Sequence, residues 1–207
     1  MPGKHPDKNT QEAFVKRLLS LVERANNPKK NEVVLSFDPT HQIHNNVNGY
    51  LWQERGKEGT KQVRSNTGRR RLNILGAVDL VSHEIVPFIT EVNCNKETIK
   101  VFLKEVKKAY SKSRKITIFL DNAKYQRNYE VQEYAEELNI TLEFMPPYSP
   151  NLCVIERLWK FFKKKIMQNT YYETFEDFYE SVCEFFKNWD DYKDELQTLF
   201  ALNFEII

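Results

Sequence analysis

Cysteine is scarce in this sequence, and its placement excludes some common architectures. Cys94, Cys153 and Cys183 are odd in number and widely spaced, and none belongs to a Cys-x-x-Cys pair. This pattern argues against a disulfide framework and against a zinc site, and it fits a reducing compartment.

Long hydrophobic runs and targeting signals are missing as well. No apolar run approaches the roughly 18 to 20 residues that a helix needs to span a bilayer. Residues 1–10 are polar and lack the apolar region of a signal peptide. The sequence also has no internal repeats and no low-complexity tracts. We therefore expect a soluble, cytoplasmic protein without a membrane partner.

A strong net charge is absent too. The 31 basic and 29 acidic residues leave a net charge of +2, which alone does not indicate a nucleic acid partner. Basic residues nevertheless gather at 57–71 and 160–165, whereas acids gather at 130–143 and 173–195. Such separation is typical of a side that faces a polyanion, although a solvated loop and a solvated helix face explain the runs equally well. The candidates for nucleic acid contact are Arg69, Arg70, Lys160, Lys163 and Lys164.

What the chain does have is enough apolar sequence for one sizeable core. Its 207 residues are 41% hydrophobic, which predicts one domain, or one domain with an appendage. Helical spacing and short β-branched runs alternate along it. Helices are expected at 11–25, 98–110, 129–138, 155–166 and 175–189. Strands are expected at 32–38, 71–81, 84–91, 115–120 and 141–145, with 50–53 as a further short candidate.

The order of these elements predicts the fold class. Two hairpin-linked strands are followed by helices and strands in alternation, which indicates an α/β protein with a mixed sheet and helices on its faces. Asn9 and Glu12 resemble a capping box for the first helix, and Thr174 is expected to cap the last long one.

Three carboxylates stand out at the expected strand and helix ends. Asp38 and Asp121 are expected at the carboxyl ends of central strands, the edge where sites form in open α/β sheets. Glu156 lies at the start of a helix behind segment 144–152, FMPPYSPNL, whose three prolines fix φ and exclude helix before them. Between Asp121 and Glu156 lie 34 residues.

Carboxylates brought together would repel one another unless a cation joins them. Their natural partner is a pair of hard divalent ions such as Mg²⁺, and two such ions can activate the attacking oxygen and stabilise the leaving oxygen of a phosphodiester. Taken singly, each carboxylate is more typical of a turn, a cap or a helix-dipole partner. Together, with the proline turn and the basic flank, they favour a site. Asp79 is the rival for Asp38, although its place beside a hairpin is typical of a turn residue.

Three segments carry a resemblance to a known family. They are LDNAKYQ at 120–126, PPYSPNL at 146–152 and IERLW at 155–159. Together they resemble the catalytic domain of insertion sequence 630 transposases, prokaryotic members of the mariner superfamily, and the match runs from about Val33 to Gln168. The spacing between Asp121 and Glu156 is also that of the family.

The resemblance implies a ribonuclease H-like fold and an Asp-Asp-Glu triad that binds two Mg²⁺ ions, for which Mn²⁺ substitutes. Asp38 would bridge both ions, and Asp121 and Glu156 would each hold one. It implies cleavage of double-stranded DNA at transposon ends, strand transfer into a TA dinucleotide, and a homodimer. Residues 32–170 would form the catalytic domain, preceded by a helix and linker at 1–31 and followed by a helical extension at 171–207 that packs on it.

The sequence departs from the family pattern in three places. Cys153-Val154 stands where the family often has Asn-Pro, and Pro39 stands where it often has an acid. The family usually carries an N-terminal helix-turn-helix region, whereas only 1–31 precede the first expected strand. Recognition of the ends would then come from another chain, a fusion or a lost segment. Two alternatives follow: an inactive DNA-binding or dimerising remnant, and a ribonuclease H-like nuclease or resolvase.

Five other residues are open to a functional or a structural interpretation. His41 and His44 could touch substrate or metal, although polar loop histidines are the commoner case. Arg157 could bind a phosphate or support a carboxylate. Trp52 and Trp159 could stack on bases, although Trp159 lies on the buried stripe of its helix and is expected in the core.

Overall fold

The structure, a computed structural model of the chain, describes residues 7–45, 47, 64–66 and 68–206. The expected strand at 50–53 and most of the basic segment at 57–71 lie outside these residues. The helical elements are α1 (Lys8–Ala25), α2 (Lys96–Ala109), α3 (Tyr129–Glu137), η1 (Pro150–Leu152), α4 (Ile155–Phe162), η2 (Lys163–Met167), α5 (Phe175–Lys187), η3 (Trp189–Tyr192) and α6 (Lys193–Leu199). The strands are β1 (Glu32–Ile43), β2 (Arg71–Asp79), β3 (Ile85–Thr90), β4 (Lys115–Leu120) and β5 (Ile140–Phe144).

The five strands form one mixed sheet in the order β3-β2-β1-β4-β5. β1, β2 and β3 pair antiparallel, whereas β4 and β5 run parallel to β1. The expected hairpin between β2 and β3 is confirmed. Asp79 closes it, because its Oδ1 accepts from the backbone N–H groups of Val81 (2.8 Å) and Ser82 (3.3 Å). Asp79 is thus a turn residue, as its position suggested.

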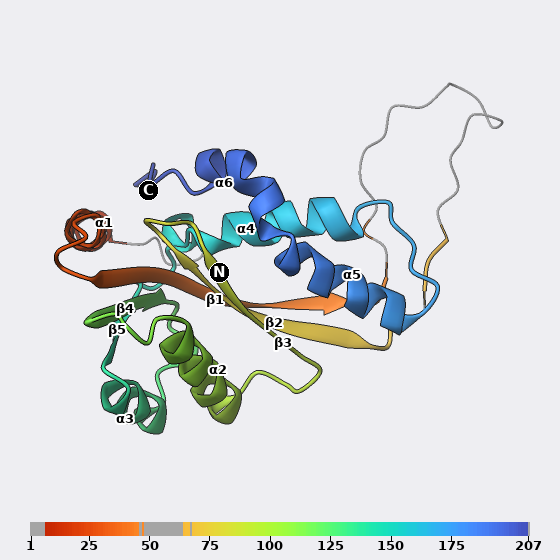
Figure 1. Cartoon of the computed structure of the whole chain (residues 1–207), viewed down its shortest axis with the longest axis horizontal. Helices are drawn as coiled ribbons and strands as arrows, with labels where there is room; N and C mark the ends of the chain where they lie inside the picture. The colour runs from red at the N-terminus through yellow and green to blue at the C-terminus, as the bar shows by residue number, and fades with distance from the viewer. Residues whose placement is uncertain (1–6, 46, 48–63, 67, 207) are drawn as a thin grey trace.

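Helices cover both faces of the sheet (Figure 1). α2 and α3 pack on one face around residues such as Phe37 and Phe102. α1, α4 and α5 pack on the other face, in a second cluster that contains Phe119, Phe162 and Phe178. The prediction of a mixed sheet flanked by helices is therefore confirmed. No helix in the described part of the chain is long and apolar enough to cross a membrane.

Two expected boundaries are wrong. The first strand does not end at Asp38 but runs on to Ile43, because β2 continues to pair with it as far as Ile43↔Arg71. The first helix begins at Lys8, and its cap is Asp7, whose Oδ2 accepts from the backbone N–H of Thr10 at 3.0 Å. The expected capping box at Asn9 and Glu12 therefore lies inside the helix.

The C-terminal elements follow their patterns more closely. Thr174 caps α5 in a reciprocal capping box with Asp177, which confirms the expected start of that helix. The expected helix at 155–166 is present, but its second part, η2, has the wider π-helical hydrogen bonding. α6 then returns across α4, and the chain ends on that side (Figure 1).

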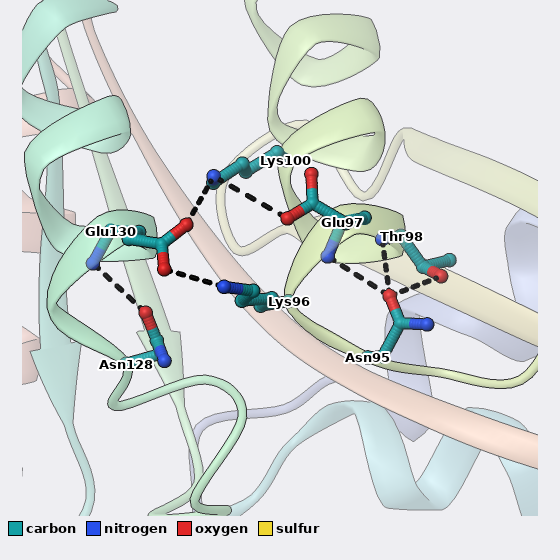
Figure 2. Close-up of polar contacts among 7 residues, drawn as sticks. All are labelled: Asn95, Lys96, Glu97, Thr98, Lys100, Asn128 and Glu130. Carbon is teal, nitrogen blue, oxygen red and sulfur yellow. Dashed lines mark hydrogen bonds and ion pairs between the residues drawn. The ribbon is translucent and has the colours of Figure 1, made fainter.

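α2 and α3 are joined by one carboxylate (Figure 2). Glu130 at the start of α3 binds Lys96 Nζ through Oε1 (2.5 Å) and Lys100 Nζ through Oε2 (3.0 Å). Asn128 and Asn95 cap the two helices beside it. The lysines of the first turns of α2 are thereby neutralised within the protein.

Candidate active site

Sheet register brings Asp38 and Asp121 to the same edge. β1 and β4 pair in parallel up to Ser36↔Phe119. Asp38 lies two residues beyond Ser36, and Asp121 lies two residues beyond Phe119, so the same register places them side by side. Asp38 is still inside β1, because β2 holds the strand there, whereas Asp121 follows the end of β4 directly. The expectation that both aspartates end central strands is thus right for Asp121 only.

Glu156 reaches this edge from α4, in whose first turn it lies as expected. The proline turn delivers it there: the short 3-10 helix η1 and the buried Leu152, Cys153 and Val154 fix the approach of α4 to the sheet. The backbone N–H of Ile155 donates to Ser36 Oγ (3.3 Å), which ties the start of α4 to β1.

A cavity of about 280 Å³ opens between Asp121 and Glu156. Its walls are these two carboxylates, Asn122 and the proline turn. Asn122 Nδ2 donates to the carbonyl oxygen of Met145, so the loop after β4 is tied to the chain that enters the turn. Asp121 Oδ1 accepts from the backbone N–H of Ala123 at 3.0 Å, which orients its side chain.

The three carboxylates influence one another electrostatically. Burial, followed by repulsion from Asp121 and from Glu156, raises the pKa of Asp38 to about 7. Burial also raises the pKa of Glu156; nearby Lys160 opposes this, and repulsion from Asp121 adds to it. Burial and then the charges of Asp38 and Glu156 raise the pKa of the Cys153 thiol. The edge is therefore short of positive charge, as expected of carboxylates whose partner is a cation.

The structure does not show an assembled metal site. Within the described ranges, no group of three or more His, Cys, Asp or Glu side chains is arranged so that it could hold an ion as it stands. Asp38, Asp121 and Glu156 thus share an edge and an electrostatic field, and their role as metal ligands stays a prediction.

Two residues beside Asp38 have roles that the sequence pattern did not predict. Trp159 is buried in the core, as expected, but its Nε1–H also donates to Asp38 Oδ2 at 3.1 Å. Gly76 is the cross-strand partner of Asp38. A Cβ on Gly76 would lie 2.7 Å from Trp159 Cη2 and 3.3 Å from Ile155 Cδ1. A glycine within an apolar strand often marks such a close approach, and that signal was available in the sequence.

The candidate nucleic acid contacts differ in availability. Arg70 is already engaged: it pairs with Glu91 (3.2 Å) and Glu176 (3.0 Å), and its guanidinium lies 3.6 Å from the centre of the Phe175 ring. Arg69 is exposed, as are Lys160, Lys163 and Lys164 on α4 and η2. Contact of these residues with nucleic acid stays a prediction, and Arg70 would have to exchange partners to make one.

His41, His44 and Arg157 make contacts that serve the fold, whereas Trp52 lies outside the described residues. His41 Nδ1 contacts Asn73 Oδ1, and His44 stacks on Phe178 with its Nε2 3.0 Å from the carbonyl oxygen of Tyr172. Arg157 is engaged by backbone carbonyl groups. Its guanidinium donates to the carbonyl oxygens of Leu199 (3.3 Å), Ala201 (2.5 Å) and Asn203 (3.0 Å), so it anchors the C-terminal segment to α4.

A mixed five-stranded sheet in this strand order, with helices on both faces, is the ribonuclease H-like architecture. Residues 33–179 match the family model described as DDE superfamily endonuclease, and the chain belongs to this family.

Solved structures share this fold, and a curated relative shares part of the sequence. The chain is similar to a pre-cleavage Mos1 transpososome (15% identity, TM-score 0.68), with 98% of this chain and 62% of that chain covered. It is similar to the Mos1 mariner transposase catalytic domain (14% identity, TM-score 0.63), with 98% and 93% covered. At these identities the likeness shows the fold, and it confirms the expected ribonuclease H-like architecture.

The curated relative is an uncharacterized protein, y4pE/y4sA, of Sinorhizobium fredii (strain NBRC 101917 / NGR234). It is 26% identical over 90 residues, which cover 44% of this chain and 64% of the relative. The chain spans less than two thirds of this relative and of the transpososome chain.

Proposed function

We propose that this chain is the catalytic domain of a DDE transposase, which cuts double-stranded DNA at the ends of a mobile element and joins them to target DNA. The observation that carries the proposal is the placement of Asp38, Asp121 and Glu156 at one edge of a ribonuclease H-like sheet, where their proximity helps to raise the pKa of Asp38. A TA dinucleotide as the target follows from the family resemblance alone. The related Mos1 structures include a strand transfer complex and a paired-end complex with the left transposon end.

The donor chemistry of the edge fits divalent cations. Carboxylate oxygens are the ligands that Mg²⁺ and Mn²⁺ prefer, and Mos1 structures have been obtained with each of these metals. In our proposal Asp38, Asp121 and Glu156 would hold the ions. When bound, the pair would activate the attacking oxygen and stabilise the leaving oxygen of the phosphodiester.

The protein itself supplies position and enclosure. The Trp159 indole fixes the orientation of Asp38, the Asn122 amide fixes the loop that carries Asp121, and the proline turn fixes the entry of Glu156. Support of this kind keeps reacting groups within the narrow geometry that phosphoryl transfer requires. A second copy of the chain and a helix-turn-helix region, on this or another chain, complete the proposed assembly.

The test is metal-dependent nicking of a duplex that carries the ends of the element. The intact chain is expected to nick this duplex with Mg²⁺ or Mn²⁺ and to stop when EDTA is added. Asp121→Asn is expected to lower the rate by at least about 10³-fold, because a metal ligand contributes several kcal/mol and each 1.4 kcal/mol is tenfold.

The matched control is Asp79→Asn, which alters a buried aspartate at the far end of β2 that only closes a turn. It is expected to lower stability and to keep nicking in the fraction that remains folded. An intact chain that binds this duplex but never nicks it would contradict the proposal, and so would undiminished nicking by Asp121→Asn.

A second candidate function is a DNA-binding remnant that no longer cuts. The absence of an assembled three-ligand group among the described residues favours it, as does Cys153-Val154 in place of the usual Asn-Pro. Calorimetric titration with Mg²⁺ separates the two, because a remnant binds DNA without a metal isotherm. A ribonuclease H or a resolvase would instead cut RNA–DNA hybrids or four-way junctions and leave element ends intact.

A further inference from the structure

A second cavity lies away from the carboxylates, at the amino ends of the parallel strands. Its volume is about 600 Å³. Its lining comes from the end of α1, the linker after it, the start of β1, the start of β4 and the turn before β5. The charged residues in this lining are Arg24, Lys30, Glu32, Arg114, Lys115 and Glu136.

Positive charge dominates this cavity. Four of the six charged residues are basic, and Glu32 is already paired with Arg24 at 2.6 Å. The ion pairs formed within the described part of the chain involve none of Lys30, Arg114 and Lys115. These three cations therefore contrast with Lys96 and Lys100, which Glu130 neutralises.

One residue holds the two basic segments together. Asn31 Nδ2 donates to the carbonyl oxygen of Lys112 (2.7 Å), and the backbone N–H of Arg114 donates to the carbonyl oxygen of Asn31 (2.9 Å). Asn31 has a φ of 50°, a left-handed conformation that asparagine tolerates better than most residues. The linker with Lys30 and the loop with Arg114, far apart in sequence, are thus fixed side by side before any ligand arrives.

Stabilisation of helix ends does not account for these cations. Arg24 lies in the last turn of α1, where a positive charge favours the helix dipole. Lys30, Arg114 and Lys115 lie outside the helices, in the linker, the loop before β4 and the first position of β4. Positive charge that forms no ion pair and is carried by two segments held together around a cavity is suited to phosphate groups.

We propose that this cavity binds the phosphodiester backbone of DNA, at a place distinct from the bond that is cut. β4 separates the two places, since Lys115 begins the strand and Asp121 follows its end. Six residues at ~3.3 Å each span about 20 Å, which is the length of about six base pairs of duplex. The inference rests on the proposed function, because DNA is the ligand that function supplies. The cavity would hold the same duplex away from its cleavage point, or a second duplex.

The test compares two double variants of equal charge. Lys30→Gln/Arg114→Gln removes two exposed cations of the cavity, and Lys16→Gln/Lys104→Gln removes two exposed cations from the outer faces of α1 and α2. Binding of a fluorescein-labelled 40-base-pair duplex is followed by anisotropy at several NaCl concentrations. EDTA is present throughout, so that cleavage does not enter the measurement.

The cavity variant is expected to bind about tenfold more weakly near 0.1 M salt, and the slope of log K against log salt should fall by about 1 to 2, close to 0.9 per lost phosphate contact. The control variant should stay within about twofold of the parent chain. Equal effects of the two variants would overturn the inference. A loss of thermal stability in the cavity variant with an unchanged salt slope would overturn it too, since the cations would then serve the fold.

Two further outcomes separate this inference from the proposed function. If the parent chain shows no DNA binding at all, both the inference and the DNA partner are overturned. If binding and its salt slope behave as expected but no metal-dependent nicking occurs, only the proposed activity fails. Polyglutamate serves as a competing polyanion. If it displaces the duplex equally well from the parent chain and from the cavity variant, the DNA binds elsewhere and the inference is overturned.

Discussion

The two ends of the parallel strands β1 and β4 carry opposite charge. At the carboxyl end, Asp38, Asp121 and Glu156 repel one another, and Lys160 is the cation that acts on Glu156. At the amino end, four basic residues surround a cavity and one of its two acids is already paired. The strand β4, about 20 Å long, thus runs between one edge suited to cations and another suited to phosphates.

Chain topology favours this division. α2, α3 and α4 begin near the carboxyl ends of β1, β4 and β5, whereas α1, α2 and α3 end beside their amino ends. Helix N-termini favour nearby anions and C-termini favour nearby cations, by about 0.3–1 kcal/mol each within the first or last turn. This includes Glu156 and Arg24 but not Lys30, Arg114 or Lys115. The comparison teaches that a mixed α/β sheet offers two electrostatically different edges before any particular site is built on them.

The prediction with the largest expected effect concerns the repulsion among the carboxylates at the carboxyl edge. The folded pKa of Asp38 is raised from 3.8 to about 7, so the folded state keeps a proton that the unfolded state loses. The stability that this proton contributes is complete below about pH 4 and is lost as pH rises through 7. In EDTA, the free energy of unfolding should fall across this range by up to about 4 kcal/mol.

Urea unfolding of the parent and of Asp38→Asn at a series of pH values measures this effect. The variant should lack this part of the pH dependence and should be the more stable of the two above pH 7. Identical pH profiles of the parent and the variant would show that Asp38 is not the carboxylate whose pKa is raised in the folded state. Saturating Mg²⁺ should flatten the parent profile, because a bound cation lowers the pKa of its ligands.

The next prediction concerns the hydrogen bond from Trp159 that orients Asp38. Trp159 and Trp189 are equally buried, at 5% exposure, and each donates one indole N–H, to Asp38 and to the carbonyl oxygen of His83 respectively. Trp159→Phe is expected to lower nicking by about 10–100-fold, as loss of a residue that orients a metal ligand does, and to weaken Tb³⁺ luminescence excited through tryptophan. Trp189→Phe should lose similar stability but keep the nicking rate and the Tb³⁺ luminescence. If both variants lose nicking and luminescence equally, Trp159 is a packing residue only.

A smaller effect tests the close approach of α4 to the sheet. Gly76→Ala places a Cβ 2.7 Å from the Trp159 ring, so α4 must shift, at about 1–3 kcal/mol of stability. The cost should be smaller in a Trp159→Phe background, because phenylalanine lacks the outer ring atoms. A double-mutant cycle in urea measures this coupling, and strictly additive losses would contradict the contact.

The smallest effect belongs to the amino edge. Asn31→Ala loses the bond to Lys112 and puts a Cβ-bearing, non-polar residue at a φ of 50°, which should destabilise the chain by about 1–2 kcal/mol. Asn31→Gly, which adopts this φ freely, should lose less. Both variants are expected to keep the nicking rate at saturating DNA, and a large drop in that rate would mean that the two edges are not independent.

The sequence was informative wherever local pattern decides structure. The strand at 115–120, the hairpin closed by Asp79 and the capping box at Thr174 follow from side-chain spacing and turn chemistry within a few residues. The start of the first helix was misplaced because Asp7 and Asn9 are both capping residues, and local pattern does not choose between them. The end of β1 was misplaced because its last residues are held by β2, a partner that begins far along the chain.

By itself, the sequence determined the family, the order of strands and helices, and the three carboxylates with the proline turn that delivers Glu156. These features depend on residue type and spacing, which the linear chain contains in full. Only the tertiary structure decided which charges are free: Arg70 is bound to Glu91 and Glu176, Arg157 anchors the C-terminal segment, and Lys30 and Arg114 meet at one cavity. The partners of a charged side chain lie on distant segments, so their identity is fixed when the sheet and its helices pack.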